Sequence, residues 1–181
     1  MKVTPTALRD VLLIEPQVLV DERGLFYESF HARLFTELTG VMANFVQDNF
    51  SRSGCNVLRG LHYQIQESQG KLIQVIAGEI FDVAVDLRQS SPSFGRWVGT
   101  ALSAANRLQQ WIPPGFAHGF LVTSASADVL YKTTAYYAPE HERSIRWDDP
   151  AIDIAWPLQS LPFLSTKDIR AGLLENAELF V

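Results

Sequence analysis

Short apolar segments separated by turn-forming residues recur along the whole chain, and this pattern restricts the fold more than any other feature. In segment 79–87, EIFDVAVDL, every second residue from Phe81 to Leu87 is apolar, while Asp82 and Asp86 fall at intervening positions. Such a period of two is typical of a half-buried β-strand. Many short strands with frequent turns predict an antiparallel sandwich or barrel. The other segments of this kind cover residues 11–14, 18–20, 24–30, 44–51, 57–64, 71–77, 97–102, 109–112, 117–123 and 129–137.

Helical patterns are scarce. One candidate covers residues 31–38 (HARLFTEL), and a second covers 165–174, where Ser165 is a plausible N-cap. A length of 181 residues without repeats or a flexible linker fits a single domain spanning 1–181. We therefore predict one mainly β domain with short peripheral helices.

Composition excludes several classes of protein. Fifteen basic and twenty acidic residues give a net charge of −5, which argues against a nucleic-acid partner but leaves room for a local basic pocket. The single cysteine, Cys55, cannot form an internal disulfide or a multi-cysteine metal site. No apolar run is long enough for a membrane span, and the start of the chain lacks a signal-peptide pattern. We expect a cytoplasmic protein that does not enter a membrane.

A local motif narrows the fold further. In WIPPGFAHGFLV, Pro113, Gly115 and His118 have the spacing of the second cupin motif, which indicates a jelly-roll barrel. The first cupin motif would supply a His-x-His pair, but the comparable strand RGLHYQIQE has Gln64 two residues after His62. Because a metal site usually needs three or four ligands, we predict a pocket without a metal.

His62 has two interpretations. It is either a histidine at the edge of the core or a general base, and a base needs a second group that fixes its tautomer. On a regular strand the side chain of Arg59 points to the opposite face from His62. Gly60 between them is a candidate for a bulge that would redirect one of the two side chains.

Other polar and aromatic residues leave similar alternatives open. Tyr131 and Tyr137 are six residues apart, so on an unbroken strand they share a face, as core residues or as pocket residues. Lys71 opens an apolar strand, either as a solvated end or as a cation aimed into a pocket. Gln47 and Asn49 share a strand face, where their amides serve structural hydrogen bonds or contact a ligand.

Ten motifs appear in order from about residue 10 to the C-terminus. They are DERGLFYESF, FVQDNFSRS, LRGLHYQ, QGKL, GEIFDVAVDLR, SPSFG, IPPGFAHGF, VLYKTTAYYAPEHER, WDDP and LSTKD. Together they resemble the dTDP-4-dehydrorhamnose 3,5-epimerase family. The resemblance implies a cupin-type antiparallel jelly-roll barrel that needs no metal or other cofactor. It also implies a substrate that is a dTDP-linked 4-keto-6-deoxy sugar.

The resemblance assigns the chemistry to four residues. Carbons 3 and 5 of such a sugar both flank the ketone, so the same carbonyl acidifies both protons. His62 then resembles the general base, and Asp168, which spacing alone cannot place, its partner. Lys71 resembles the cation that holds the developing oxyanion, and Tyr131 the acid that reprotonates the opposite face.

The resemblance also implies the binding residues. Tyr137 resembles a residue that stacks on thymine, and Arg59 resembles a ligand of the diphosphate. Gln47 and Asn49 occupy positions that contact the nucleotide. Further positions that match ligand contacts are His118, Glu142 and Lys167.

Arg23, Phe26 and Glu28 resemble residues that reach the site of a neighbouring subunit, which implies a homodimer with exchanged strands. Arg23 and Arg59 would then gather with Lys71 and Lys167 around one diphosphate. Two alternatives remain at this stage. One is a 3-only epimerase or keto-isomerase with the same fold, and the other is a cupin that binds a ligand without catalysis.

Overall fold

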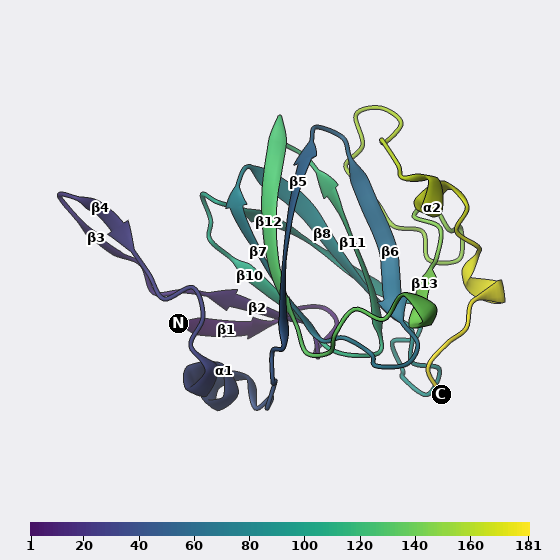
Figure 1. Cartoon of the computed structure of the whole chain (residues 1–181), viewed down its shortest axis with the longest axis horizontal. Helices are drawn as coiled ribbons and strands as arrows, with labels where there is room; N and C mark the ends of the chain where they lie inside the picture. Colours follow the sequence, from purple (N-terminus) through teal and green to yellow (C-terminus); the bar gives the residue numbers. More distant parts are fainter.

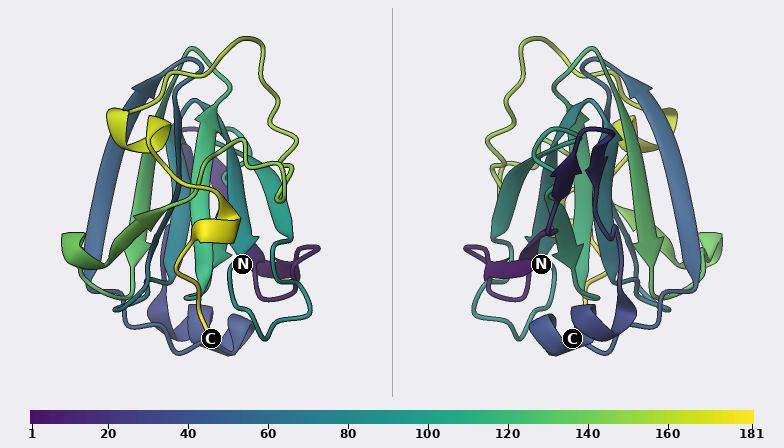
Figure 2. Two further views of the ribbon diagram at one scale, coloured as in Figure 1. Left: turned by 90° about the vertical axis from the view of Figure 1, so that its right-hand side faces the viewer. Right: turned by 90° about the vertical axis from the view of Figure 1, so that its left-hand side faces the viewer.

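Two antiparallel sheets packed face to face form the body of the protein. The computed structural model describes all 181 residues, Met1–Val181. The sheets enclose an apolar core and give the molecule the shape of a flattened barrel (Figures 1 and 2). The mainly β fold predicted from the sequence is therefore confirmed. One sheet contains, in spatial order, β1 (Lys2–Pro5), β2 (Leu12–Glu15), β10 (Gln109–Ile112), β7 (Lys71–Ala77), β12 (Ser126–Thr133) and β5 (Gln47–Gly54). The other contains β13 (Glu142–Ser144), β6 (Leu58–Gln64), β11 (Phe116–Val122), β8 (Glu79–Asp86) and β9 (Trp97–Ser103).

Most predicted strand boundaries hold to within a few residues, at the edge strand β9 as well as in the interior, although β12 begins and ends earlier than predicted. Segments 71–77 and 109–112 coincide with β7 and β10. The sequence pattern missed the short edge strands β1 and β13, and segment 24–30 is a strand only over its first three residues. Edge strands bury fewer side chains, so their alternation is weak.

Both predicted helices exist, but the second is shorter than expected. α1 (Ala32–Thr39) begins after His31, whose ring Nδ1 accepts a hydrogen bond from the backbone of Leu34. α2 covers only Thr166–Ile169, and Ser165 is its N-cap as predicted. The residues after α2 form turns instead, including the 3-10 helix η2 (Leu174–Asn176). A further 3-10 helix, η1 (Pro139–His141), precedes β13.

The prediction that β8 is half-buried was wrong, because both of its faces are covered. Ile80 and Ala84 pack in the core between the sheets, while Val83 and Val85 pack against the C-terminal segment. That segment crosses the outside of the five-stranded sheet (Figure 2, left). The polar face that includes Asp82 is therefore turned into the protein rather than into solvent.

A hairpin formed by β3 (Leu19–Asp21) and β4 (Gly24–Phe26) projects away from the barrel (Figure 1). It exposes apolar side chains, with Val20 77% and Phe26 65% exposed.

None of the helices is long and apolar enough to cross a membrane.

Candidate active site

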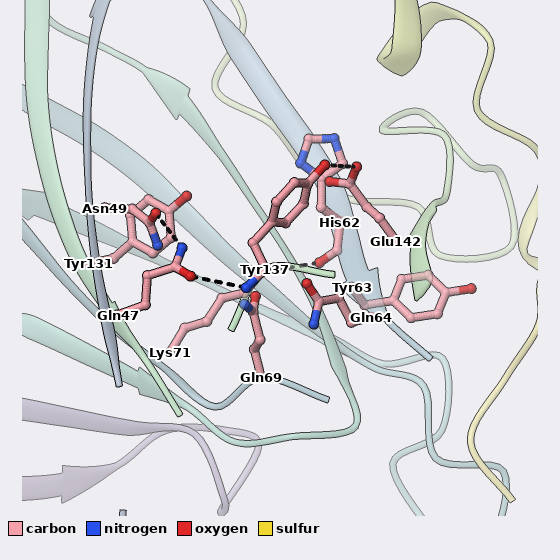
Figure 3. A pocket seen from close by; sticks show the side chains of 10 residues that line it. All are labelled: Gln47, Asn49, His62, Tyr63, Gln64, Gln69, Lys71, Tyr131, Tyr137 and Glu142. Atoms are coloured by element: carbon pink, nitrogen blue, oxygen red, sulfur yellow. Dashed lines mark hydrogen bonds between the residues drawn. The ribbon is translucent and has the colours of Figure 1, made fainter. Parts of the chain in front are cut away.

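A polar cavity of about 300 Å³ is lined by residues from both sheets (Figure 3). Seven of its ten lining residues were predicted from the sequence, although they come from widely separated segments. These seven are Gln47, Asn49, His62, Lys71, Tyr131, Tyr137 and Glu142. The other three are Tyr63, Gln64 and Gln69.

Asp168 lies next to His62, as the resemblance implied. Its Oδ1 is 2.5 Å from Nε2 of His62, although 106 residues separate the two in sequence. Two backbone hydrogen bonds hold the C-terminal segment against the start of β6. The N–H of Phe163 donates to the carbonyl of Asn56, and the carbonyl of Phe163 accepts from the N–H of Leu58. Asp168 itself is held by the α2 cap, since its Oδ2 accepts a hydrogen bond from Ser165 Oγ at 2.8 Å.

The environment of this pair favours a neutral histidine beside a charged carboxylate. Burial lowers the pKa of His62 and outweighs the opposing effect of Asp168. Burial would raise the pKa of Asp168, but hydrogen bonds from His62 and Ser165 lower it overall. A neutral imidazole that donates one N–H to a carboxylate leaves its other ring nitrogen free to accept a proton.

A bulge in β6 brings Arg59 to the same cavity as His62. The register of β6 against β11 shifts between the pairs His62–His118 and Arg59–Phe120. Gly60 lies in this irregularity with φ +129°, and a Cβ there would come within 2.5 Å of the β11 backbone, so only glycine fits. The strand is therefore not regular here, and the bulge predicted at Gly60 is confirmed, with Arg59 and His62 lining one cavity.

Arg59 and Lys167 bring positive charge to a second cavity next to the first. They line a neighbouring cavity of about 450 Å³ together with Asp168 and with His62, which also lines the first cavity. Arg23 does not join them within one chain, because it lies on the projecting hairpin and pairs with Asp21. Of the four cations expected around one diphosphate, two line this cavity, Lys71 lines the first cavity, and Arg23 lies on the hairpin.

Lys71 and Tyr131 supply a cation and a phenol to the first cavity from adjacent strands. Lys71 is only 8% exposed, and burial lowers its pKa to about 8, although the charges of Asp82 and Glu142 oppose the shift. Its ammonium group lies 3.5 Å from the backbone oxygen of His62. Burial raises the pKa of Tyr131, which keeps its phenol protonated. The cavity thus combines a proton acceptor, a proton donor and a cation.

Tyr137 lines the cavity for a different reason than expected. β12 ends at Thr133, so Tyr137 does not continue that strand and instead reaches the cavity from the segment that follows it. The phenol of Tyr137 donates a hydrogen bond to Glu142 at 3.0 Å (Figure 3). Glu142 lies on β13, and it also accepts a hydrogen bond from Lys167 at 2.7 Å.

Gln47 and Asn49 lie on β5, where the Gln47 amide donates to Asn49 Oδ1 at 2.8 Å. Both amides face the cavity (Figure 3).

His118 is not among the residues that line either cavity. Its Nε2 lies 2.7 Å from Oδ1 of Asp82, and the other carboxylate oxygen, Oδ2, accepts a hydrogen bond from Gln110 at 3.0 Å. Sequence reasoning missed Asp82 as a partner of His118, although a carboxylate in an otherwise apolar strand was a usable signal.

No group of three or more His, Cys, Asp or Glu residues is arranged to hold a metal ion.

Known proteins with this fold and sequence place the chain among the isomerases that epimerise nucleotide-linked sugars. The chain belongs to the dTDP-4-dehydrorhamnose 3,5-epimerase family, whose model matches residues 5–176. It is 57% identical over 180 residues to the dTDP-4-dehydrorhamnose 3,5-epimerase of Pseudomonas aeruginosa, and the match covers 99% of each chain. The family and the jelly-roll fold predicted from the motifs are thereby confirmed.

Two solved structures show how far the fold extends within the family. The dTDP-6-deoxy-D-glucose-3,5-epimerase of Legionella pneumophila, in complex with dTDP-4-keto-L-rhamnose, superposes with a TM-score of 0.96 at 55% identity, covering 98% of this chain and 94% of that one. A 3′-monoepimerase from Streptomyces bikiniensis, in complex with dTDP-quinovose, superposes with a TM-score of 0.89 at 32% identity, covering 97% and 88%.

Proposed function

We propose that this chain epimerises carbons 3 and 5 of dTDP-4-dehydro-6-deoxy-D-glucose to give dTDP-4-dehydro-L-rhamnose, with His62 as the base. The observation that carries the proposal is the His62–Asp168 pair, whose imidazole lines the same cavity as Lys71 and Tyr131. These groups match the needs of proton transfer next to a ketone.

Each epimerisation is a pair of proton transfers. His62 removes the proton from the carbon beside the ketone, and the electron pair moves into an enolate whose oxygen is stabilised by the ammonium group of Lys71. Asp168 stabilises the imidazolium that forms. Tyr131 then gives its proton to the opposite face of the same carbon, and exchange with solvent restores both residues. The reaction changes configuration only, so it needs no oxidant or reductant.

The remaining predicted residues are proposed to bind the nucleotide. Tyr137 is half-exposed at the cavity mouth, where its ring is available to stack on thymine. The guanidinium of Arg59 suits the diphosphate because of its forked donors. Further contacts are assigned to Gln47, Asn49, Glu142 and Lys167, but not to His118, which lines neither cavity.

A homodimer is part of the proposal. The β3–β4 hairpin projects from the barrel and exposes apolar side chains, which supports an exchange of this segment between two subunits. Arg23, Phe26 and Glu28 would then complete the partner's nucleotide site.

We also expect the protein to act in the cytoplasm.

A second candidate is epimerisation at carbon 3 alone. The similarity to a 3′-monoepimerase of the same fold supports it, because the fold does not decide whether carbon 5 is reached.

One NMR experiment separates these candidates. The sugar nucleotide is incubated with the protein in deuterated water, and deuterium is counted at each carbon. We expect two deuterons and inversion at carbons 3 and 5. One deuteron at carbon 3 would establish the monoepimerase, and no exchange would overturn both.

A further inference from the structure

Tyr137 lies on a segment that no strand or helix supports. β12 ends at Thr133 and the 3-10 turn η1 begins at Pro139. Neither Tyr136 nor Tyr137 takes part in a backbone–backbone hydrogen bond. The side chain of Tyr137 is also 53% exposed, so packing restrains it only in part. A ring that stacks on a base binds best when it is held in place beforehand, so this segment needs another restraint.

Gln64 holds the peptide groups on both sides of Tyr137. Its Nε2 donates a hydrogen bond to the carbonyl of Tyr136 at 3.1 Å, and its Oε1 accepts one from the N–H of Ala138 at 2.9 Å. A third hydrogen bond, from Nε2 to the carbonyl of Glu67 at 3.0 Å, fixes the amide itself. Gln64 is 3% exposed, so water cannot take the place of any of these hydrogen bonds when the amide is removed.

Two more glutamines complete the restraint. Gln47 on β5 accepts a hydrogen bond from the N–H of Tyr137 at 3.0 Å (Figure 3). Gln69, in the loop before β7, donates to the carbonyl of Ala135 at 3.0 Å. Gln47 and Gln64 belong to different sheets, so the segment is fixed to both walls of the cavity.

We propose that Gln64 is a positioning residue for nucleotide binding, which acts by holding the backbone around Tyr137 so that its ring is ready for the base. The inference rests on the proposed function, in which Tyr137 stacks on thymine. Gln64 occupies the position where a metal-binding cupin would carry its second histidine, and here its amide serves the loop instead. All three hydrogen bonds of the Gln64 amide go to the protein backbone, so we expect its effect to fall on binding and not on proton transfer.

The test is a double-mutant cycle of Gln64→Met and Tyr137→Ala, with dTDP binding measured by calorimetry and turnover measured in parallel. Gln64→Met keeps the side-chain length but removes the amide. It should raise the Kd of dTDP and KM by about tenfold, a fraction of the stacking energy, while kcat changes by less than about threefold. In the Tyr137→Ala background the same substitution should change Kd by less than about twofold.

Asn106→Leu is the matched control. The Asn106 amide also makes three backbone hydrogen bonds, to Ala101, Ser103 and Leu108, in the turn between β9 and β10. Its loss should lower the melting temperature without changing Kd. Where Gln64→Met does not fold, Gln69→Leu removes only the bond to Ala135 and should raise Kd by about twofold to threefold.

Equal effects of Gln64→Met on Kd with and without the Tyr137 ring would overturn the positioning role, as would an unchanged Kd in a folded variant. Either result, with a wild-type protein that turns over, leaves the proposed function standing. A wild-type protein that neither binds dTDP nor exchanges protons would remove the proposed function and the positioning role together.

Discussion

The protein contains two His–Asp pairs on neighbouring strands, and they differ in access. His62 and His118 are register partners on β6 and β11. The imidazole of His62 is 24% exposed and that of His118 is 8% exposed. Asp168 reaches His62 from the C-terminal segment, whereas Asp82 is fully buried on β8, adjacent to β11. The same residue types therefore form one pair that a ligand can reach and one that is enclosed in the barrel.

The surroundings of each His–Asp pair determine what it can do. His62 combines a lowered pKa with an open side toward two cavities, which suits a base. The carboxylate of Asp82, which pairs with His118, also accepts a hydrogen bond from Gln110, and His118 lines neither cavity. These features suit a residue that stabilises the interior of the barrel. The predictions below test this division of roles.

The largest effect is expected at the accessible pair. Asp168→Asn removes the charge that stabilises the imidazolium but keeps the shape of the side chain. We expect kcat to fall by about 10²–10⁴-fold, with a thermal melting temperature close to that of the wild-type protein. An activity within tenfold of the wild type would show that His62 works without a charged partner.

The enclosed pair should respond in stability. His118→Ala leaves Asp82 buried without its imidazole, and the free energy of unfolding should fall by about 3 kcal/mol. Urea denaturation followed by fluorescence measures this loss. A variant as stable as the wild type would contradict a supporting role for the enclosed pair.

The pH dependence of kcat/KM should report the protonation of His62 on its acid limb and of Lys71 on its alkaline limb. kcat/KM requires neutral His62, so it should fall with decreasing pH below the ordinary histidine pKa of about 6.5, because burial lowers the pKa of His62. It also requires protonated Lys71, so it should fall by about tenfold per unit as the pH rises above about 8. In Lys71→Arg the alkaline fall should disappear. An alkaline fall that persists in that variant would assign the limb to another group.

The smallest effect is expected from the group behind Asp168. Ser165→Ala removes one hydrogen bond to the carboxylate and the cap of α2. The free energy of unfolding should fall by about 1 kcal/mol and kcat by about threefold to tenfold. Ser160→Ala, in the same C-terminal segment but bonded to Asn56 instead, is the control and should leave kcat unchanged.

Local sequence patterns predicted most strands of the two sheets to within a few residues, because a period of two is visible in a short stretch of sequence. They failed for β13, which is three residues long, and for the second half of the expected helix 165–174. The two-sided burial of β8 depends on a C-terminal segment without regular structure, which periodicity does not detect.

The candidate site shows the same limit. The motifs and the family resemblance named seven of the ten cavity residues. Local spacing did not place Asp168 beside His62, because a contact across 106 residues depends on the complete fold. The orientation of Arg59 depended on one bulge at Gly60. Gln64 was noted only as a missing metal ligand, and its hydrogen bonds to the backbone around Tyr137 became visible in three dimensions.

The most direct test of the two-pair account is position-specific deuterium exchange by His62→Ala, followed by NMR of the sugar nucleotide in deuterated water. If His62 is the base for both carbons, exchange at carbon 3 and at carbon 5 should fall together, by about 10²–10⁴-fold. If one carbon still exchanged at the wild-type rate, a second base would be required, and the division between the two His–Asp pairs would be contradicted.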